Sequence, residues 1–244
     1  MLVTAINQAT AGAGEPGTQA APGLTDLALL QLLRLVSPSL PIGGFAWSQG
    51  LEYAIDSGVL TGAEQIGNWL EGVMRNNLTH LDLPLILRLH QAAEDGERAK
   101  LEHWNDFILT CRETHELYQE DIQLGAALYR LLASLDSPTL GSGFRPVSML
   151  CGFAETGAGH NIPAETCALG WLWSWLENQL TVASKTLPLG QTDVQKLLQR
   201  LIPALPGCVA VAKGVADEDL GASFPGFTMN SAWHETQYSR LFRS

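Results

Sequence analysis

The chain has 244 residues, a length that suits one large domain or two small ones and is sufficient to bury a core without disulfide bonds or metal ions. Hydrophobic residues make up 46% of the sequence and charged residues only 16%, which indicates either a surface partly covered by partner protein or simply an alanine-rich composition. The formal net charge is -11 without a cluster of lysine and arginine, which argues against nucleic acid and against an anionic membrane as partners.

Residues 1–23 consist mainly of alanine, glycine, threonine and proline without periodicity, and we expect them to form a flexible tail. The segment has no basic start and no apolar stretch long enough for a signal sequence or a membrane span. The four cysteines lie far apart and form no CxxC pair. We therefore expect a cytoplasmic protein with reduced, mostly buried thiols.

After this tail, apolar residues recur with helical spacing. The segment LTDLALLQLLRLVSP is apolar on nearly every face, which predicts a buried helix that ends before Pro38. The following segment, SPSLPIGGFAWSQGLE, combines stiff prolines with permissive glycines, and Ser48 can cap a helix that begins at Gln49. Two interpretations of this segment remain open: a tight connection whose aromatic residues fill the core, or a rigid loop that presents Phe45 to a partner.

The middle of the chain continues the helical pattern. Thr61 and Glu64 form a capping box in front of an amphipathic helix. Further helices are expected over residues 82–90, 97–114, 118–135 and 146–156. The segment SPTLGSGFRP is the clearest loop, and because the helices on both sides of it have similar character, we interpret it as a long connection within one domain.

The tryptophan-rich segment ALGWLWSWLENQL is apolar on two sides, which predicts a helix at the centre of a bundle. Lys185 follows near the C-terminal end of this helix, where the helix dipole favours a cation, and a polar contact to a partner is the alternative interpretation. Thr192 and Gln195 are expected to cap the next helix, which turns Ile202 and four other apolar side chains inward. Since no segment alternates like a strand, the sequence predicts an all-α fold of about nine to ten helices.

The chain ends in SAWHETQYSRLFRS, where aromatic residues alternate with arginines. Tryptophan, tyrosine and arginine dominate the hot spots of protein interfaces, whereas chain ends are usually frayed and polar. Two interpretations remain open: this segment folds back on the body of the protein, or it binds another protein.

A search for catalytic motifs gives no complete set. The sequence contains no GxxxxGK[ST], no GxSxG and no GxGxxG that follows a predicted strand. Cys111 and His115 have the spacing of two metal ligands on one predicted helix, but two ligands do not make a site. His234 with Glu235, and the run Asp217–Asp219, are weaker candidates for which hydrogen bonding and a solvated turn are the simpler interpretations. The sequence therefore predicts no catalytic, cofactor or metal site.

Four segments together resemble the UreF family of urease accessory proteins: LLRLVSPSLPIGGFAWSQGLE, CRETHELYQEDIQLGAAL, WLENQLTVASKTLPLGQTD and SAWHETQYSRLFRS. The resemblance implies an all-α protein without catalytic activity or cofactor, which is often dimeric. It also implies a complex with UreD (UreH in some organisms) and the GTPase UreG. That complex acts on apo-urease so that nickel and a lysine carbamate complete the active site, and UreF influences how UreG uses GTP.

The resemblance also implies roles for individual residues. Tyr238, Arg240, Leu241 and Phe242 match the tail that docks on UreD, and Phe45 matches an aromatic residue in the same contact. Lys185 matches a lysine in the segment implicated in communication with UreG, whereas the role of Trp47 stays open. The implied organisation is a UreF-like domain over residues 24–229 and a docking segment over 230–244. Two alternatives are a nickel metallochaperone that uses Cys111, His115 or His234, and a helical enzyme of unknown substrate.

Overall fold

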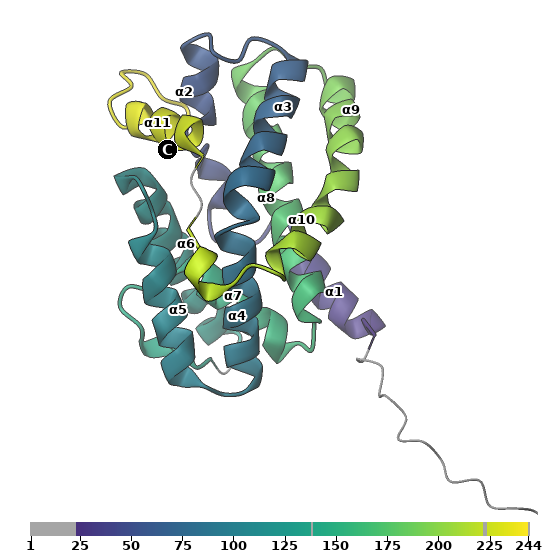
Figure 1. Ribbon diagram of the computed structural model, residues 1–244, viewed down its shortest axis with the longest axis vertical. Helices are drawn as coiled ribbons and strands as arrows, with labels where there is room; N and C mark the ends of the chain where they lie inside the picture. The colour runs from purple at the N-terminus through teal and green to yellow at the C-terminus, as the bar shows by residue number, and fades with distance from the viewer. Residues whose placement is uncertain (1–22, 138, 222–223, 244) are drawn as a thin grey trace, which may run out of the picture.

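The computed structural model describes residues 23–137, 139–221 and 224–243, and this part of the chain forms helices and no β-strand (Figure 1). The predicted all-α fold is confirmed, whereas the tail predicted over residues 1–23 lies, except for Gly23, outside the described residues. The α-helices are α1 (Asp26–Leu35), α2 (Leu51–Asp56), α3 (Ala63–Val73), α4 (Asp82–Glu94), α5 (Arg98–Thr110), α6 (His115–Ser134), α7 (Met149–Gly159), α8 (Ala164–Thr186), α9 (Gln191–Leu201), α10 (Leu205–Ala212) and α11 (Pro225–His234). A π turn over Met74–Leu78 continues α3, and short 3-10 turns cover Gly44–Ala46, Gly141–Gly143, Ile202–Ala204 and Asp217–Asp219.

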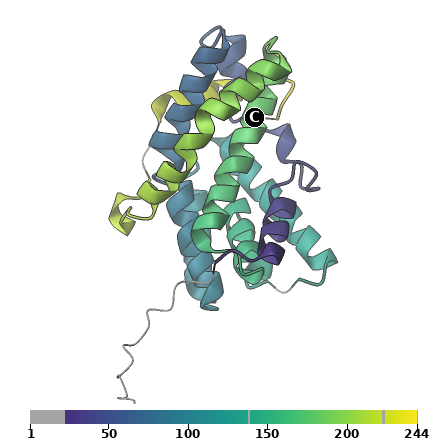
Figure 2. The same cartoon turned by 90° about the vertical axis from the view of Figure 1, so that its right-hand side faces the viewer.

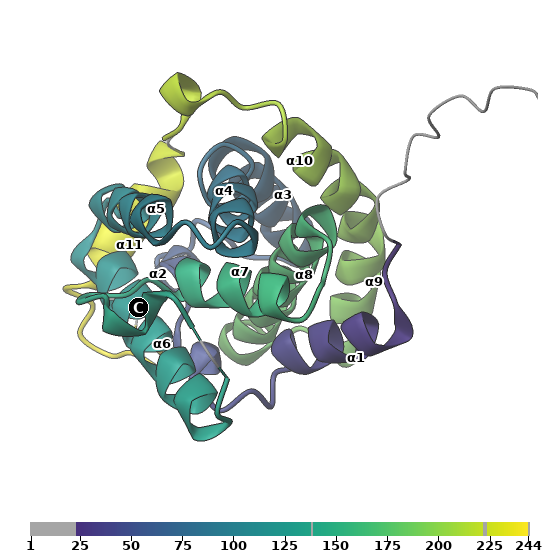
Figure 3. The same ribbon diagram turned by 90° about the horizontal axis from the view of Figure 1, so that it is seen from below.

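The core is organised around α7 and α8, which lie in the middle of the view in Figure 3 with α1, α4, α6, α9 and α10 around them. Helix α7 is buried without interruption over residues 150–157. Its small residues permit this, because a Cβ atom at Gly157 would lie only 2.4 Å from the sulfur of Cys167 on α8. In α8, Leu172, Trp175 and Leu176 are buried, so the predicted central position of the tryptophan-rich helix is confirmed.

The prediction that the first helix is buried is wrong. Helix α1 lies on the outside of the fold against α8, and only Ala28, Leu32 and Leu35 of its residues are buried (Figure 2). Leu27 and Leu30 are 67% and 63% exposed. The helix is apolar on nearly every face, but among the described residues no second element covers its outer side.

Three predicted helix starts also differ from the structure. Helix α2 begins at Leu51 rather than Gln49, and its N-cap residue is Gly50 instead of Ser48. Helix α3 has no side-chain cap, because the hydroxyl and the backbone N–H of Thr61 both donate to the side chain of Gln65. Helix α9 begins directly at Gln191, again without a side-chain cap, so that Thr192 and Gln195 lie inside it, and Ile202 is 41% exposed rather than inward.

The four cysteines are free, and three of them are buried, as expected; Cys111 is half-buried. Burial raises the pKa of the thiols of Cys151 and Cys167 to about 12. Both thiols therefore stay protonated at neutral pH and pack as small apolar groups.

Candidate functional site

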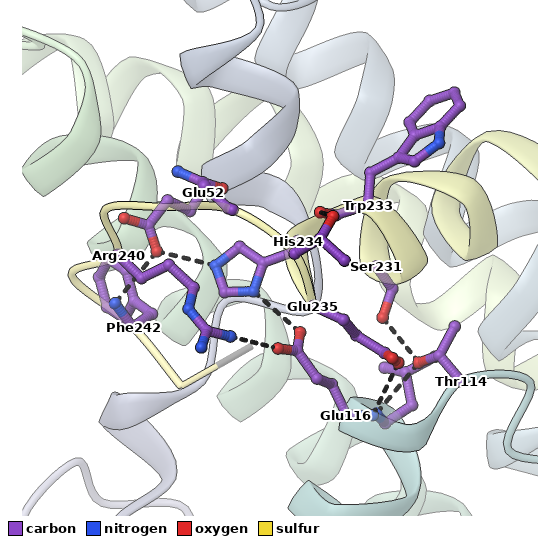
Figure 4. Close-up of polar contacts among 12 residues, drawn as sticks. Glu52, Thr114, Glu116, Ser231, Trp233, His234, Glu235, Arg240 and Phe242 are labelled. Atoms are coloured by element: carbon purple, nitrogen blue, oxygen red, sulfur yellow. Dashed lines mark hydrogen bonds and ion pairs between the residues drawn. The ribbon is translucent and has the colours of Figure 1, made fainter.

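The C-terminal segment folds back on the body of the protein. After α11 ends at His234, the chain turns and returns across the side of α2 and α6 (Figure 4). The backbone N–H of Arg243 donates to the carbonyl oxygen of Ala46 over 2.8 Å, so the tail reaches the loop that carries Phe45. The backbone of the tail therefore folds back on the body, which was one of the two interpretations, although some side chains of the tail remain exposed.

His234 is the centre of the contact between α11 and the body. Its imidazole is fully buried, with Nδ1 2.8 Å from Oε2 of Glu116 and Nε2 3.0 Å from Oε2 of Glu52. Only the protonated imidazolium can donate at both nitrogens. Burial lowers the pKa of His234, but the hydrogen bonds and negative charges of the two glutamates outweigh burial and raise this pKa above its ordinary value.

The same two glutamates hold the last residues of the chain. Glu52 accepts the backbone N–H of Leu241 at Oε1 over 2.6 Å and that of Phe242 at Oε2 over 3.0 Å. Glu116 accepts Nη1 of Arg240 over 2.8 Å. We call Glu52, Glu116, His234 and Arg240 the tail latch. Its two carboxylates face two cations, and this balance of charge offsets the cost of burying the carboxylates and His234.

Helix α11 is fixed in position before the tail begins. Gly50 has a positive φ of 78°, and a Cβ atom there would lie 2.4 Å from the backbone nitrogen of Ser231. The hydroxyl of Ser231 lies 2.8 Å from that of Thr114, the N-cap of α6. Only glycine permits this close approach in a left-handed conformation, so the start of α2 determines where α11 and His234 lie.

The predicted partner residues lie on or beside this docked tail. The ring of Phe242 is buried, and Nζ of Lys185, at the end of α8, lies 5.8 Å from its centroid. Phe45 is 62% exposed in the neighbouring 3-10 turn, while Leu241 is 73% exposed and Tyr238 is fully exposed. The structure thus brings the Phe45 loop, Lys185 and the chain end together, and divides them into anchors that face the body and side chains that face solvent.

Sequence reasoning did not find Glu52 and Glu116. Both are buried glutamates in the first turn of a helix. Glu52 lies 182 positions and Glu116 118 positions before His234 in the chain. The sequence could indicate only that a glutamate on a buried helix face needs a cation or several hydrogen-bond donors as partners. The sequence gives no information about which cation that is.

The metal candidates from the sequence are not assembled. Cys111 is the C-cap of α5, whereas His115 is the first residue of α6, so the prediction that both lie on one helix is wrong. Asp217, in the run Asp217–Asp219, pairs with Arg88. Among the described residues, no group of three or more histidine, cysteine or acidic side chains has an arrangement that fits a metal ion. In the same part of the chain, no helix combines the length and apolar character needed to span a membrane.

Comparison with known proteins gives a consistent result over most of the chain. The family model described as UreF matches residues 60–202. A urease accessory protein UreF from Hahella chejuensis is 50% identical over 219 residues, which cover 89% of this chain and 99% of the relative. UreF from Chromohalobacter salexigens is 48% identical over 231 residues, 94% and 99% of the two chains. UreF from Pseudoalteromonas translucida is 46% identical over 225 residues, 90% and 96% of the two chains.

Proposed function

Because this chain belongs to the UreF family of urease accessory proteins, we propose that it is a non-enzymatic scaffold in the maturation of urease. It links UreD (or UreH) and the GTPase UreG to apo-urease, so that nickel is inserted into the active site, and it modulates the use of GTP by UreG. It works in the cytoplasm, as a homodimer within the complex, without nucleic acid or membrane.

The observation that carries this proposal is the docked tail. Arg240 and Phe242 serve as anchors on the body of the protein, and Tyr238 and Leu241 project from the same short segment into solvent. A partner that contacts a segment already held in place does not have to order it, so more of the contact energy is available for binding. In this proposal residues 230–244 form the docking segment for UreD, and residues 24–229 form the body that supports it.

Phe45 extends the proposed UreD surface beyond the tail. The loop that carries it is joined to the tail by the hydrogen bond between Arg243 and Ala46, and Cζ of Arg243 lies 5.9 Å from the ring of Trp47. Trp47 is 3% exposed and fills the core, whereas Phe45 is 62% exposed. The loop with the exposed Phe45 and the tail with the exposed Leu241 are thus bonded to each other, and together they offer apolar side chains of the kind found at interfaces.

Lys185 is the residue that we propose for communication with UreG. It is exposed at the C-terminal end of α8, and its ammonium group lies near the ring of Phe242. A partner bound at Lys185 would therefore lie next to the tail. This proximity supports a scaffold in which UreG and UreD occupy adjoining surfaces.

The test is reconstitution of urease activation. Apo-urease, UreD, UreG, nickel, bicarbonate and GTP are combined with and without this chain, and co-purification of the proteins is measured in parallel. The expected result is that active urease and the complex of UreD with UreG both depend on the chain. Equal urease activation without it would contradict the proposal. A direct nickel-binding role is not proposed, because no observation on the described residues favours it.

A further inference from the structure

A cavity of about 190 Å³ lies between the loop that carries Phe45 and helices α4, α6, α7 and α8. Most of its wall is apolar and aromatic, formed by Leu40, Phe45, Leu124, Phe153, Trp171 and Trp175. Its polar part contains Gln49, Asp82, Arg112, Glu120 and Asp121. An apolar cavity with a few converging polar groups is the usual form of a small-ligand site.

Glu120 has one carboxylate oxygen without a hydrogen-bond partner. The side chain is 8% exposed, and its Oε1 accepts Nε2 of Gln49 over 3.0 Å. Gln49 is itself held by Trp175, whose Nε1 donates to its Oε1 over 2.7 Å. These two bonds determine the orientation of the carboxylate, and Oε2 remains buried and unpaired.

Asp82 contributes a second unpaired oxygen to the same cavity. Arg112 lies between two aspartates: its Nη2 is 2.9 Å from Oδ1 of Asp82, and its Nε is 2.7 Å from Oδ2 of Asp121. Asp121 also accepts two hydrogen bonds at Oδ1, from the hydroxyl of Ser148 and the backbone of Met149. Oδ2 of Asp82 has no such partner, although Asp82 is 1% exposed.

Two buried, unpaired acceptors in an apolar cavity require a ligand that supplies donors and positive charge. A bare metal ion is not favoured, because no group of three or more suitable ligands is assembled among the described residues. A compact ammonium carries three donors, and the methylenes attached to it suit an apolar wall. We propose that the cavity binds a primary alkylammonium group, whose stem lies against the aromatic wall and whose nitrogen donates to Glu120 and Asp82.

The ionisation of Glu120 gives this site a pH dependence. Burial raises the pKa of Glu120 to about 8, although the hydrogen bond from Gln49 and the charge of Arg112 act in the opposite direction. Asp121 and Asp82 add smaller effects that raise it further. Because an ammonium ligand needs the carboxylate, binding expels the proton. The affinity should therefore rise roughly 20-fold between pH 6.5 and pH 8.5.

The experiment uses the isolated full chain, so its outcome does not depend on urease maturation. The probe is n-butylamine hydrochloride, titrated while the NMR signal of the Trp175 indole N–H is followed, because this group is linked to Glu120 through Gln49. Two matched probes, n-butanol and n-butyrate, have a similar stem without the positive charge. We expect saturable binding of n-butylammonium and at least tenfold weaker binding of both matched probes.

Variants and a second amine complete the test. Glu120→Gln keeps the shape of the side chain and should weaken n-butylammonium at least tenfold, whereas Glu102→Gln on the exposed side of α5 should not change the binding. Nα-acetyl-lysine methylamide represents a lysine of a partner protein: if it binds as tightly as n-butylammonium, the source is a protein side chain, and if it does not, the source is a free amine.

Three results would overturn the proposal: no saturable shift, equal binding of n-butanol, or unchanged binding by Glu120→Gln. If that variant does not fold, the pH dependence of the unmodified chain decides, and a flat profile between pH 6.5 and pH 8.5 would refute the proposal.

Discussion

Replacing Glu52 with glutamine changes the tail latch while keeping the size of the side chain. Glu52 accepts three hydrogen bonds, from the backbone N–H groups of Leu241 and Phe242 and from the imidazolium of His234. A glutamine amide has only one acceptor oxygen, and its NH2 group would face an N–H donor. The Glu52→Gln variant should therefore release the tail.

The magnitude follows from the contacts that are lost. At least one buried N–H group loses its acceptor, at a cost of about 1–3 kcal/mol, and the imidazolium of His234 loses one of its two negative partners. Together these changes should cost about 3 kcal/mol, which is near the lower limit for breaking a buried ion pair. This energy corresponds to roughly a 100-fold increase in the opening of the tail.

Hydrogen exchange measures this opening directly at the amides of Leu241 and Phe242. In Glu52→Gln both amides should exchange about 100-fold faster, and trypsin should cleave more rapidly after Arg240. The far-UV circular dichroism should stay unchanged, because the body helices keep their apolar contacts. Glu102→Gln, on an exposed face of α5, is the matched control and should leave both amides protected. Unchanged exchange at both amides in Glu52→Gln would refute the role assigned to the latch.

Three further predictions concern pH, backbone geometry and the surface of α1. The pKa of His234 is raised in the folded state, so the stabilisation of the docked tail by His234 is complete below about pH 6.5 and is lost as the pH rises through the raised pKa. NMR signals of the tail should show this weakening of docking. The His234→Gln variant should abolish the pH dependence. Gly50→Ala should destabilise the protein by about 3 kcal/mol in denaturant unfolding, whereas Gly58→Ala, with a positive φ but open space, should cost only about 1 kcal/mol. Leu27→Gln should change the stability by less than about 0.5 kcal/mol, in contrast to about 2–5 kcal/mol for Leu32→Ala; a large effect at Leu27 would show that its face is covered.

The positions of most helices up to α9 could be predicted from the sequence because apolar spacing reports helical periodicity directly, whereas α10 and α11 were not predicted. The spacing also indicated that the tryptophan-rich helix is central, and Trp175 and Leu176 are indeed buried. The same reasoning failed for α1, since a helix that is apolar all around can be buried or can expose leucines such as Leu27 and Leu30. The local pattern of a helix does not determine how many neighbours cover it.

The tail latch could not be predicted, for a different physical reason. The residue types in SAWHETQYSRLFRS left open whether the segment folds back or binds another protein, and Glu52 and Glu116 come from helices that begin far away in the chain. The predicted capping box of Thr61 and Glu64 is also absent, because the hydroxyl of Thr61 donates to the side chain of Gln65 instead of accepting a backbone N–H at the start of the helix. Polar contacts depend on the final positions of atoms, which periodicity does not determine.

The most direct test of the account is the affinity of UreD for a chain in which only the exposed tail side chains are removed. Tyr238→Ala combined with Leu241→Ala keeps the backbone bond from Leu241 to Glu52, so the latch stays closed. The account predicts at least 30-fold weaker binding in calorimetry, with unchanged tail protection. The control Val211→Ala, at an equally apolar exposed position on α10, should bind UreD normally. Full affinity of the double variant would contradict the claim that the docked tail is the surface presented to UreD.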